Sequence, residues 1–271
     1  MNAPAGIAPD EVTVTRPEAG IAALTLNRPA ARNALSLAMI KSLHGHFDAL
    51  SRDTSIAAII LAANGPVFCA GHDLKEMTAR RSDADHGKAF FETVMTSCSA
   101  MMQAMIACSK PVIAAVEAPA TAAGCQLVAT CDLAIAATTA TFATPGVNIG
   151  LFCSTPMVAL SRNLARKRAM EMLLTGDAVS AKDAAEFGLI NRAVAKEAVM
   201  PETLDLARKI VTKSKATVAI GKEAFYRQIE QPLTQAYDYA ARVMAENMLI
   251  ADAGEGICAF LEKRAPKWND T

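Results

Sequence analysis

The sequence has no excess of positive or negative charge, and it has no long apolar run. Lys plus Arg and Asp plus Glu number 27 each, so the formal net charge is zero. This balance argues against a broad basic face for nucleic acid or an anionic membrane, although a small anion site is still allowed. The run from Pro111 to Ala123 is too short to cross a bilayer, which takes about 20 residues, and Glu117 interrupts it. We therefore expect no nucleic acid and no membrane among the partners.

The sequence also lacks paired cysteine motifs and a recognisable targeting segment. Its seven cysteines are an odd number, lie mostly in apolar runs and form no C-x-x-C pair, so we expect buried reduced thiols and no metal site. The N-terminal stretch MNAPAGIAPDEVTV resembles neither a secretory signal nor an Arg-rich transit peptide, which predicts a cytoplasmic location.

Length and composition indicate a large folded core. The 271 residues suffice for one large domain, or for one domain with a small appendage. Hydrophobic residues make up 52% and charged residues 20%, so more apolar surface is available than a monomer needs to bury. We expect the chain to self-associate.

The first half of the chain alternates strand and helix patterns. Two Val-, Ile- and Thr-rich segments, 11–16 and 21–26, predict an opening hairpin, and the apolar stripe of 36–53 predicts a helix that packs on a sheet. The continuous apolar runs of 56–62, 112–116 and 133–137 are typical of strands buried on both faces, and helices are expected at 83–107 and 123–130. This order favours an α/β core with parallel strands.

Beyond about Thr155 the strand patterns almost vanish, and the C-terminal part is expected to be wholly helical. We predict a core over residues 1–200 and a helical oligomerisation region over 201–271. The predicted helices span 165–175, 181–187, 201–213, 217–228, 233–249 and 255–263.

Two glycine-containing turns offer backbone N–H groups to a negatively charged oxygen. The run AAGCQLVATCDLA, Ala122 to Ala134, places small residues ahead of a predicted helix, and FCAGHD, Phe68 to Asp73, has a strand-then-glycine character. Two rigid N–H groups of this kind stabilise negative charge on the oxygen of a thioester carbonyl. Because they are backbone amides, they do this without any pKa that the protein has to adjust.

In these segments, and over Val12 to Trp268, the sequence resembles the crotonase (enoyl-CoA hydratase/isomerase) family. The resemblance implies a ClpP-like spiral of ββα units, a C-terminal helical region that builds trimers or hexamers, and an acyl-CoA thioester as ligand, with coenzyme A as part of that ligand rather than a separate cofactor. It also assigns the oxyanion-hole amides to His72 and Ala123. Hydratases of this family carry two acid/base glutamates, which would fall at Gln126 and Gly146 in this chain.

Neither Gln126 nor Gly146 can transfer protons, and each such transfer contributes about 10²–10⁴ in rate. Cys153 and Ser154 fall where some relatives carry a catalytic aspartate, but no base is identifiable beside them, so a packed thiol and a helix N-cap are the plainer interpretation. The remaining candidates have structural interpretations that we prefer. These are a packed or solvent-facing ring for His72 and His86, turn pinning for Asp73 and Asp132, and core filling for Met101, Met102 and Met105. Asn148 is a candidate for holding a water molecule.

Coenzyme A brings several phosphate charges, so its site needs a few cations and an apolar slot. The resemblance places Arg28, Arg32, Ala70 and Lys75 at the nucleotide pocket. It places Lys263 and Arg264 at the phosphates, either in the same subunit or in a neighbouring one. For each cation, a solvated surface charge is an equally good interpretation.

The sequence thus leaves two functions open. One is a hydratase/isomerase whose chemistry uses an unusual group, and the other is a protein that binds, delivers or senses acyl-CoA without chemistry. A third interpretation, an oligomer with a vestigial site, predicts no binding.

Overall fold

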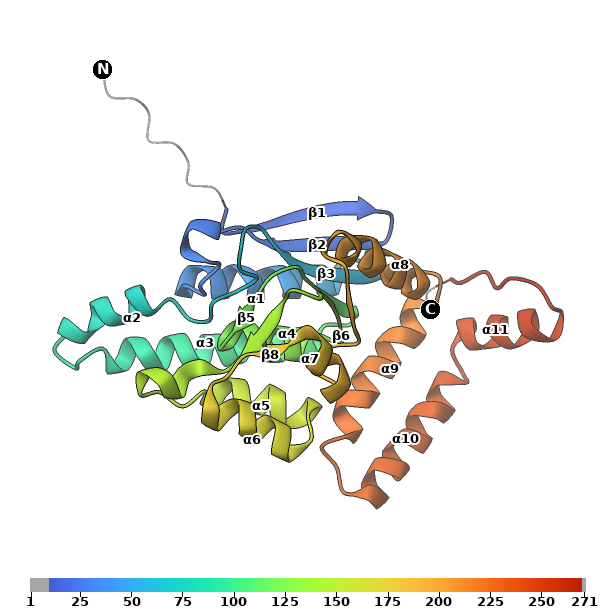
Figure 1. Cartoon of the computed structure of the whole chain (residues 1–271). Helices are drawn as coiled ribbons and strands as arrows, with labels where there is room; N and C mark the ends of the chain where they lie inside the picture. The colour runs from blue at the N-terminus through green and yellow to red at the C-terminus, as the bar shows by residue number, and fades with distance from the viewer. Residues whose placement is uncertain (1–9, 270–271) are drawn as a thin grey trace.

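The computed structural model describes residues 10–269, in which a six-stranded sheet forms the centre (Figure 1). The strand order is β1-β2-β3-β4-β6-β9. β1 is antiparallel to β2, and every other neighbouring pair is parallel. The strands are β1 (Val12–Glu18), β2 (Ile21–Leu26), β3 (Ala58–Ala63), β4 (Val112–Val116), β6 (Leu133–Ala137) and β9 (Arg192–Val194).

The parallel strands predicted from continuous apolar runs are confirmed. All five residues of β4 are buried, as are five of the six in β3, because helices cover the sheet. The predicted opening hairpin is also confirmed, with Val12 paired to Leu26 and Glu18 to Ile21.

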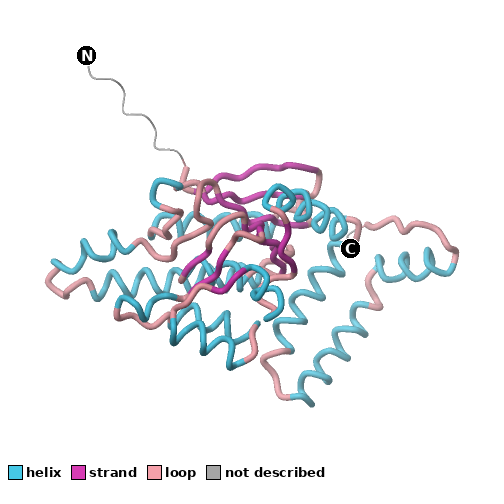
Figure 2. Tube along the Cα trace, in the orientation of Figure 1, coloured by secondary structure: helices cyan, strands magenta, loops and turns pink. Residues whose placement is uncertain are grey.

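A second sheet of three short strands lies beside the first (Figure 2). It consists of β5 (Ala120–Thr121), β7 (Thr141–Ala143) and β8 (Val179–Ser180). Since β8 and β9 both follow Thr155, the prediction of a wholly helical part beyond that residue is wrong. Two- and three-residue strands show no period of their own, and only their pairing partners define them.

The N-terminal helices pack on the large sheet and on one another. α1 (Leu37–Arg52) begins at the N-cap Ser36, whose Oγ accepts a hydrogen bond from Met39 N, and it packs against α3 (Lys88–Ala107). α3 begins five residues later than predicted, after Gly87 in the left-handed conformation. α2 (Leu74–Ala79) was not predicted, because it buries none of its residues and so has no apolar stripe.

The later helices divide between the core and a projecting group. α4 (Ala123–Thr130), α5 (Ser154–Asn163), α6 (Arg166–Thr175) and α7 (Ala181–Phe187) belong to the core, and α8 (Val199–Val211) packs across β2, β3, β4 and β6. α9 (Lys215–Gln228) leads to α10 (Leu233–Asn247) and α11 (Ala251–Leu261), which pack on α9 and extend away from the sheet (Figure 1). The helices predicted at 217–228, 233–249 and 255–263 correspond to α9, α10 and α11.

Candidate functional site

The two glycine-containing turns predicted from the sequence meet in the structure. Cys69 forms an isolated parallel bridge with Ala120, and Thr121 N donates to Cys69 O at 2.9 Å. A Cβ atom at Gly124 would lie 2.1 Å from Cys69 O, so only glycine allows α4 to approach the first turn this closely. The segments 68–73 and 120–124 therefore form one local structure, although about fifty residues separate them in the chain.

The amide of His72 points toward the second turn and away from the loop before α1. Leu35 N donates to Gly71 O at 2.7 Å, and Asp73 N donates to Leu35 O at 3.0 Å. Because backbone groups of successive residues in an extended segment face opposite sides, the N–H of His72 faces away from Leu35.

The amide of Ala123 opens helix α4 next to Gly71. Ala122 precedes it with a φ of 51° and a ψ of −120°, a conformation that L-residues rarely adopt. A Cβ atom at Gly71, whose own φ is +94°, would lie 3.3 Å from Ala123 N. Within residues 10–269 neither the His72 amide nor the Ala123 amide donates a hydrogen bond. Two such donors, one of them at a helix N-terminus, form an arrangement suited to a developing oxyanion.

Two buried side-chain atoms at these turns lack a hydrogen-bond partner among the described residues. They are Nε2 of His72 and Oε1 of Gln126, and Gln126 is 4% exposed. Burial lowers the pKa of His72 to about 4, so its imidazole is neutral at physiological pH. Nearly all buried polar groups in proteins have partners, so these two atoms can pair with water or with a ligand.

Gly146 lies on a different loop, and its surroundings leave no room for a side chain. A Cβ atom there would lie 2.8 Å from Leu151 O and 2.9 Å from Cys153 Sγ. Burial raises the pKa of the Cys153 thiol, and a hydrogen bond from the Gly146 backbone partly offsets that rise. A thiol with a raised pKa is a poor nucleophile, which fits the packed interpretation of Cys153.

Ser154 does not occupy the predicted N-cap position. It is exposed and is the first residue of α5, while Cys153 precedes the helix. The Ser154 hydroxyl donates to Phe152 O at 3.3 Å.

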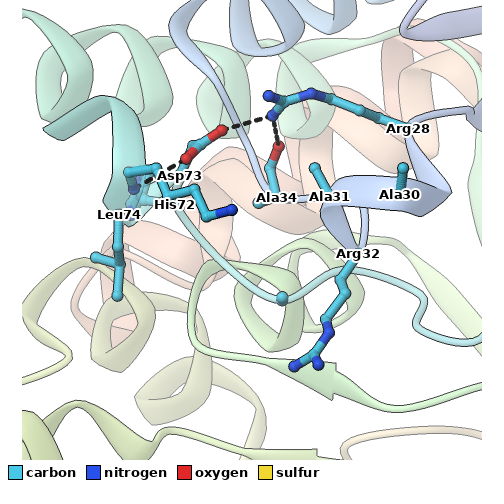
Figure 3. A pocket seen from close by; sticks show the side chains of 10 residues that line it. Arg28, Ala30, Ala31, Arg32, Ala34, His72, Asp73 and Leu74 are labelled. Atoms are coloured by element: carbon cyan, nitrogen blue, oxygen red, sulfur yellow. Dashed lines mark hydrogen bonds and ion pairs between the residues drawn. The ribbon is translucent and has the colours of Figure 1, made fainter. Parts of the chain in front are cut away.

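A pocket of about 740 Å³ opens beside His72 (Figure 3). Arg28, Arg32, Ala70 and Lys75 line it as predicted for the nucleotide site, together with His72, Asp73, Leu74 and three alanines of the loop before α1. The structure thus brings four of the six predicted coenzyme A residues to one cavity, immediately next to the His72 turn.

The cations of this pocket differ in how their charge is compensated. Arg28 Nη1 contacts Asp73 Oδ2 at 2.7 Å (Figure 3). Arg28 Nε contacts Glu11 Oε1 at 3.2 Å. Arg32 and Lys75 are exposed, and no ion pair to another described residue is found for either. Free positive charge in the pocket therefore comes mainly from Arg32 and Lys75.

The prediction that Asp73 and Asp132 pin the backbone is confirmed. Asp73 Oδ1 accepts hydrogen bonds from Lys75 N and Glu76 N at the start of α2. Asp132 is bound by Lys222 Nζ at 2.7 Å, by Tyr226 Oη at 2.8 Å and by Val112 N at 2.6 Å. The Asp132 contacts attach α9 to the ends of β4 and β6.

Several other candidates lie away from the pocket. His86 is exposed in the turn before α3 rather than on a helix, and Asn148 is exposed. Lys263 and Arg264 follow α11 and do not line the pocket, and Arg264 forms ion pairs with Glu255 and Glu262. The three methionines Met101, Met102 and Met105 are buried in the core cluster, as the core-filling interpretation requires.

Asn33 is a site-building residue that the sequence analysis missed. It is fully buried with a φ of 51°, and its side chain accepts a hydrogen bond from Arg28 N and donates to Asn64 O and Val67 O. These bonds hold the loop before α1 against the segment leading to Phe68. The only available signal was an asparagine within a loop, which does not by itself predict such a role.

Neither a metal site nor a membrane span is found in the part of the chain that the structure describes. No group of three or more His, Cys, Asp or Glu side chains is arranged to hold a metal ion. None of the described helices combines the length and apolarity that crossing a membrane requires.

Comparison with known proteins identifies the class to which this fold and site belong. The family model for enoyl-CoA hydratase/isomerase matches residues 16–271, and the chain belongs to that family. Its fold is the α/β crotonase fold with two sheets and C-terminal helices, as the resemblance implied.

Within the family the chain is similar to enoyl-CoA hydratase domain-containing protein 3. It is 46% identical to the mitochondrial protein of that name from Mus musculus over 258 residues, which cover 95% of this chain and 84% of the mouse protein. The crystal structure of the human protein matches with a TM-score of 0.89 at 44% identity, covering 95% of this chain and all of the other. A crystal structure of an enoyl-CoA hydratase from Mycobacterium smegmatis matches with a TM-score of 0.91 at 52% identity, covering 95% and 98% of the two chains.

Proposed function

We propose that this protein binds acyl-CoA thioesters and holds the thioester carbonyl oxygen between the backbone amides of His72 and Ala123. The single observation that supports this most strongly is the meeting of the two turns, with both amides free of partners within residues 10–269. Such donors stabilise negative charge that develops on the oxygen, and they also provide a good binding site for the neutral carbonyl.

Coenzyme A occupies the pocket beside His72 in this proposal. Arg32 and Lys75 contact its phosphates, Arg28 and Ala70 shape the wall, and Lys263 with Arg264 of a neighbouring subunit reach the phosphates from outside. The chain is proposed to form a homotrimer or a homohexamer through its C-terminal helices.

Hydration of an enoyl thioester is proposed to be weak or absent. Gln126 occupies one position where the family resemblance places a glutamate, and Gly146 occupies the other, where no side chain fits without movement of Leu151 and Cys153. His72, whose backbone amide belongs to the proposed hole, has a pKa of about 4, so its imidazole is neutral at neutral pH and is not a general acid there. These features favour an acyl-CoA-binding role over a hydratase with an unusual catalytic group.

Binding and turnover can be measured on the same preparation. We expect isothermal titration calorimetry to detect saturable binding of crotonyl-CoA and butyryl-CoA. We expect the ultraviolet absorbance of the enoyl thioester to stay constant in the presence of the protein, with no deuterium entering butyryl-CoA from D₂O. Absence of binding contradicts the proposed function, and rapid loss of the enoyl absorbance contradicts the proposed lack of hydration.

The cytoplasmic location stays a prediction. It depends on residues 1–14, of which 1–9 lie outside the described residues, and the vertebrate relatives are named as mitochondrial.

A further inference from the structure

The final described residues, 262–269, form a tail that runs back along helix α11. After α11 ends at Leu261, the chain returns from the far end of this helix toward the junction of α8 and α9 (Figure 1). Asn269 N donates to Asp252 Oδ1 at 2.7 Å, and Asp252 lies in the first turn of α11. The tail therefore spans the length of the helix that precedes it.

Charged side chains hold the first part of the tail on α11. Arg264 donates from Nη1 and Nη2 to the two carboxylate oxygens of Glu255, at 2.6 and 2.9 Å. Glu255 Oε1 also accepts a hydrogen bond from Lys267 N at 2.7 Å. The hydrogen bonds from Arg264 lower the pKa of Glu255 to about 2, so this carboxylate stays charged at physiological pH. Glu255 thus holds both ends of the turn between residues 264 and 267.

Trp268 attaches the tail to the core. Its indole Nε1 donates to Thr212 O at 2.8 Å, and Thr212 is the residue that ends α8. The C-terminal carbonyls of a helix lack partners within the helix, and the indole N–H supplies one. The Trp268 ring also lies against Gly256 of α11, where an added Cβ atom would be 3.2 Å from two ring carbons. One side chain therefore joins α11 to α8, and the absence of a side chain at Gly256 leaves room for the ring.

Helices α10 and α11 bury few residues of their own. α10 contains no buried residue, and in α11 the buried residues are Asp252 and Ala259. Both of these bond the tail, because Asp252 accepts from Asn269 N and Ala259 O accepts from Arg264 N at 3.0 Å. Elements with few buried side chains open at a small cost in free energy. Loss of the tail contacts should therefore release the two helices before the core unfolds.

We propose that the tail is a strap that holds α10 and α11 against the core, and that unseating Trp268 frees these two helices to move while the core stays folded. The seat of Trp268 is the space between Gly256 and Thr212. The strap requires no ligand, so it is independent of the proposed acyl-CoA site.

Hydrogen–deuterium exchange of the full-length protein, measured by mass spectrometry, tests the strap. We expect Trp268→Ala to raise the exchange rates of the α11 amides about tenfold to a hundredfold, because it removes both the hydrogen bond to Thr212 and the ring contact. Trp268→Phe keeps a ring and loses the N–H, so the increase should be smaller, about threefold to tenfold. Exchange in β3 and β4 should match that of the wild type in both variants.

Two glycines of α11 supply a matched pair of variants. Gly256→Ala adds a methyl group against the Trp268 ring, whereas nothing lies within 4 Å of a Cβ atom added at Gly254. Both substitutions raise the helix propensity by the same amount, so their difference reports on the seat alone. We expect the tail and α11 to exchange about threefold or more faster in Gly256→Ala than in Gly254→Ala.

Three results would each overturn the strap. Unchanged exchange of α11 in Trp268→Ala would show that the tail does not hold the helix. An equal rise in α11, β3 and β4 would show that the tail supports the whole fold and that the two helices do not open separately. Equal exchange in the two glycine variants would show that Trp268 is not seated on Gly256. A failure of acyl-CoA binding would leave all three readouts unaffected.

Discussion

Gly146 and Cys153 are packed so closely that position 146 has no room for a side chain. A Cβ atom at Gly146 would lie 2.9 Å from Cys153 Sγ and 2.8 Å from Leu151 O. A substitution that adds a side chain must displace backbone as well as the thiol.

Adding even one methyl group at position 146 should destabilise the protein. We expect Gly146→Ala to lower the free energy of unfolding by about 1–3 kcal/mol, the usual cost of overpacking. The control is Gly221→Ala, where nothing lies within 4 Å of the added Cβ and the helical position gains about 0.5–1 kcal/mol. Urea denaturation measures both variants, and equal effects of the two substitutions would show that the loop around Gly146 is not tightly packed.

The buried imidazole of His72 should give the protein an acid-sensitive stability. Its pKa is about 4 in the folded chain against 6.5 ordinarily, so between these values the unfolded chain binds more protons than the folded one. This contribution to stability is present above about pH 6.5 and is lost as the pH falls toward 4. Each unit of pKa difference is worth about 1.4 kcal/mol.

Thermal unfolding across this pH range tests the assignment. We expect the unfolding temperature of the wild type to fall between pH 6.5 and 4, and that of His72→Asn to depend less on pH in the same window. If the unfolding temperatures of the two proteins depend on pH in the same way, His72 is not buried in its neutral form.

The sequence predicted the site residues only where a local pattern carries the information. The two glycine-containing turns are visible in the sequence, and the family resemblance then assigned the donor amides to His72 and Ala123. The contact between Gly71 and Ala122, the strained conformation of Ala122 and the hydrogen bonds of Asn33 were not predictable, since each depends on a segment distant in the chain.

The loop before α1, the start of helix α2 and the segment 68–73 together form the wall of the pocket beside His72. Arg28 joins Glu11 and Asp73, and Asp73 in turn caps α2. Leu37 N donates to Glu76 Oε2 at 3.0 Å, which attaches the start of α1 to α2 as well. These contacts fix the pocket wall before any ligand arrives, so little ordering is needed on binding.

We therefore expect the three basic residues of the pocket to differ in function, with two acting in ligand binding and one in stability. We expect Arg32→Ala and Lys75→Ala each to weaken acyl-CoA binding about threefold to tenfold, and to reduce its salt dependence, without loss of stability. Arg28→Ala should instead lower the free energy of unfolding by about 1–3 kcal/mol, because it leaves the Asp73 carboxylate without its partner.

Calorimetry at two salt concentrations and urea denaturation give the two readouts. If Arg28→Ala leaves stability unchanged and abolishes binding, Arg28 is a phosphate ligand rather than a structural clamp.

The strands and helices that the sequence predicted best are those with a clear pattern of their own, such as the continuous apolar runs of β4 and β6. β4, β6, α4 and α7 have the predicted bounds, whereas β5, β7, β8 and β9 were missed. The missed strands have two or three residues each, and their identity comes from pairing rather than from composition. Helix α2 was missed because it buries none of its residues and carries no apolar stripe.

Large apolar side chains are exposed on the C-terminal helices and between α10 and α11. Leu249 is 86% exposed and Phe260 is 81% exposed, and neither α9 nor α10 contains a buried residue. Uncovered apolar surface of this extent marks an interface. The proposed trimer or hexamer places these helices against a neighbouring subunit.

The mass of the protein in solution tests the proposed assembly. We expect sedimentation velocity to give three or six times the chain mass of 28.5 kDa. The double substitution Leu249→Glu and Phe260→Glu should shift the protein toward monomer while preserving its helical content, because two buried charges would face the partner. A wild-type monomer at micromolar concentration would contradict the assembly.

The most direct measurement compares butyryl-CoA with its thioether analogue S-butyl-CoA, which lacks only the carbonyl oxygen. If the amides of His72 and Ala123 hold that oxygen, calorimetry should show the thioester binding about tenfold or more tightly than the thioether, since each ligand otherwise makes the same contacts. Equal affinity of the two ligands would show that no oxyanion hole exists at these turns.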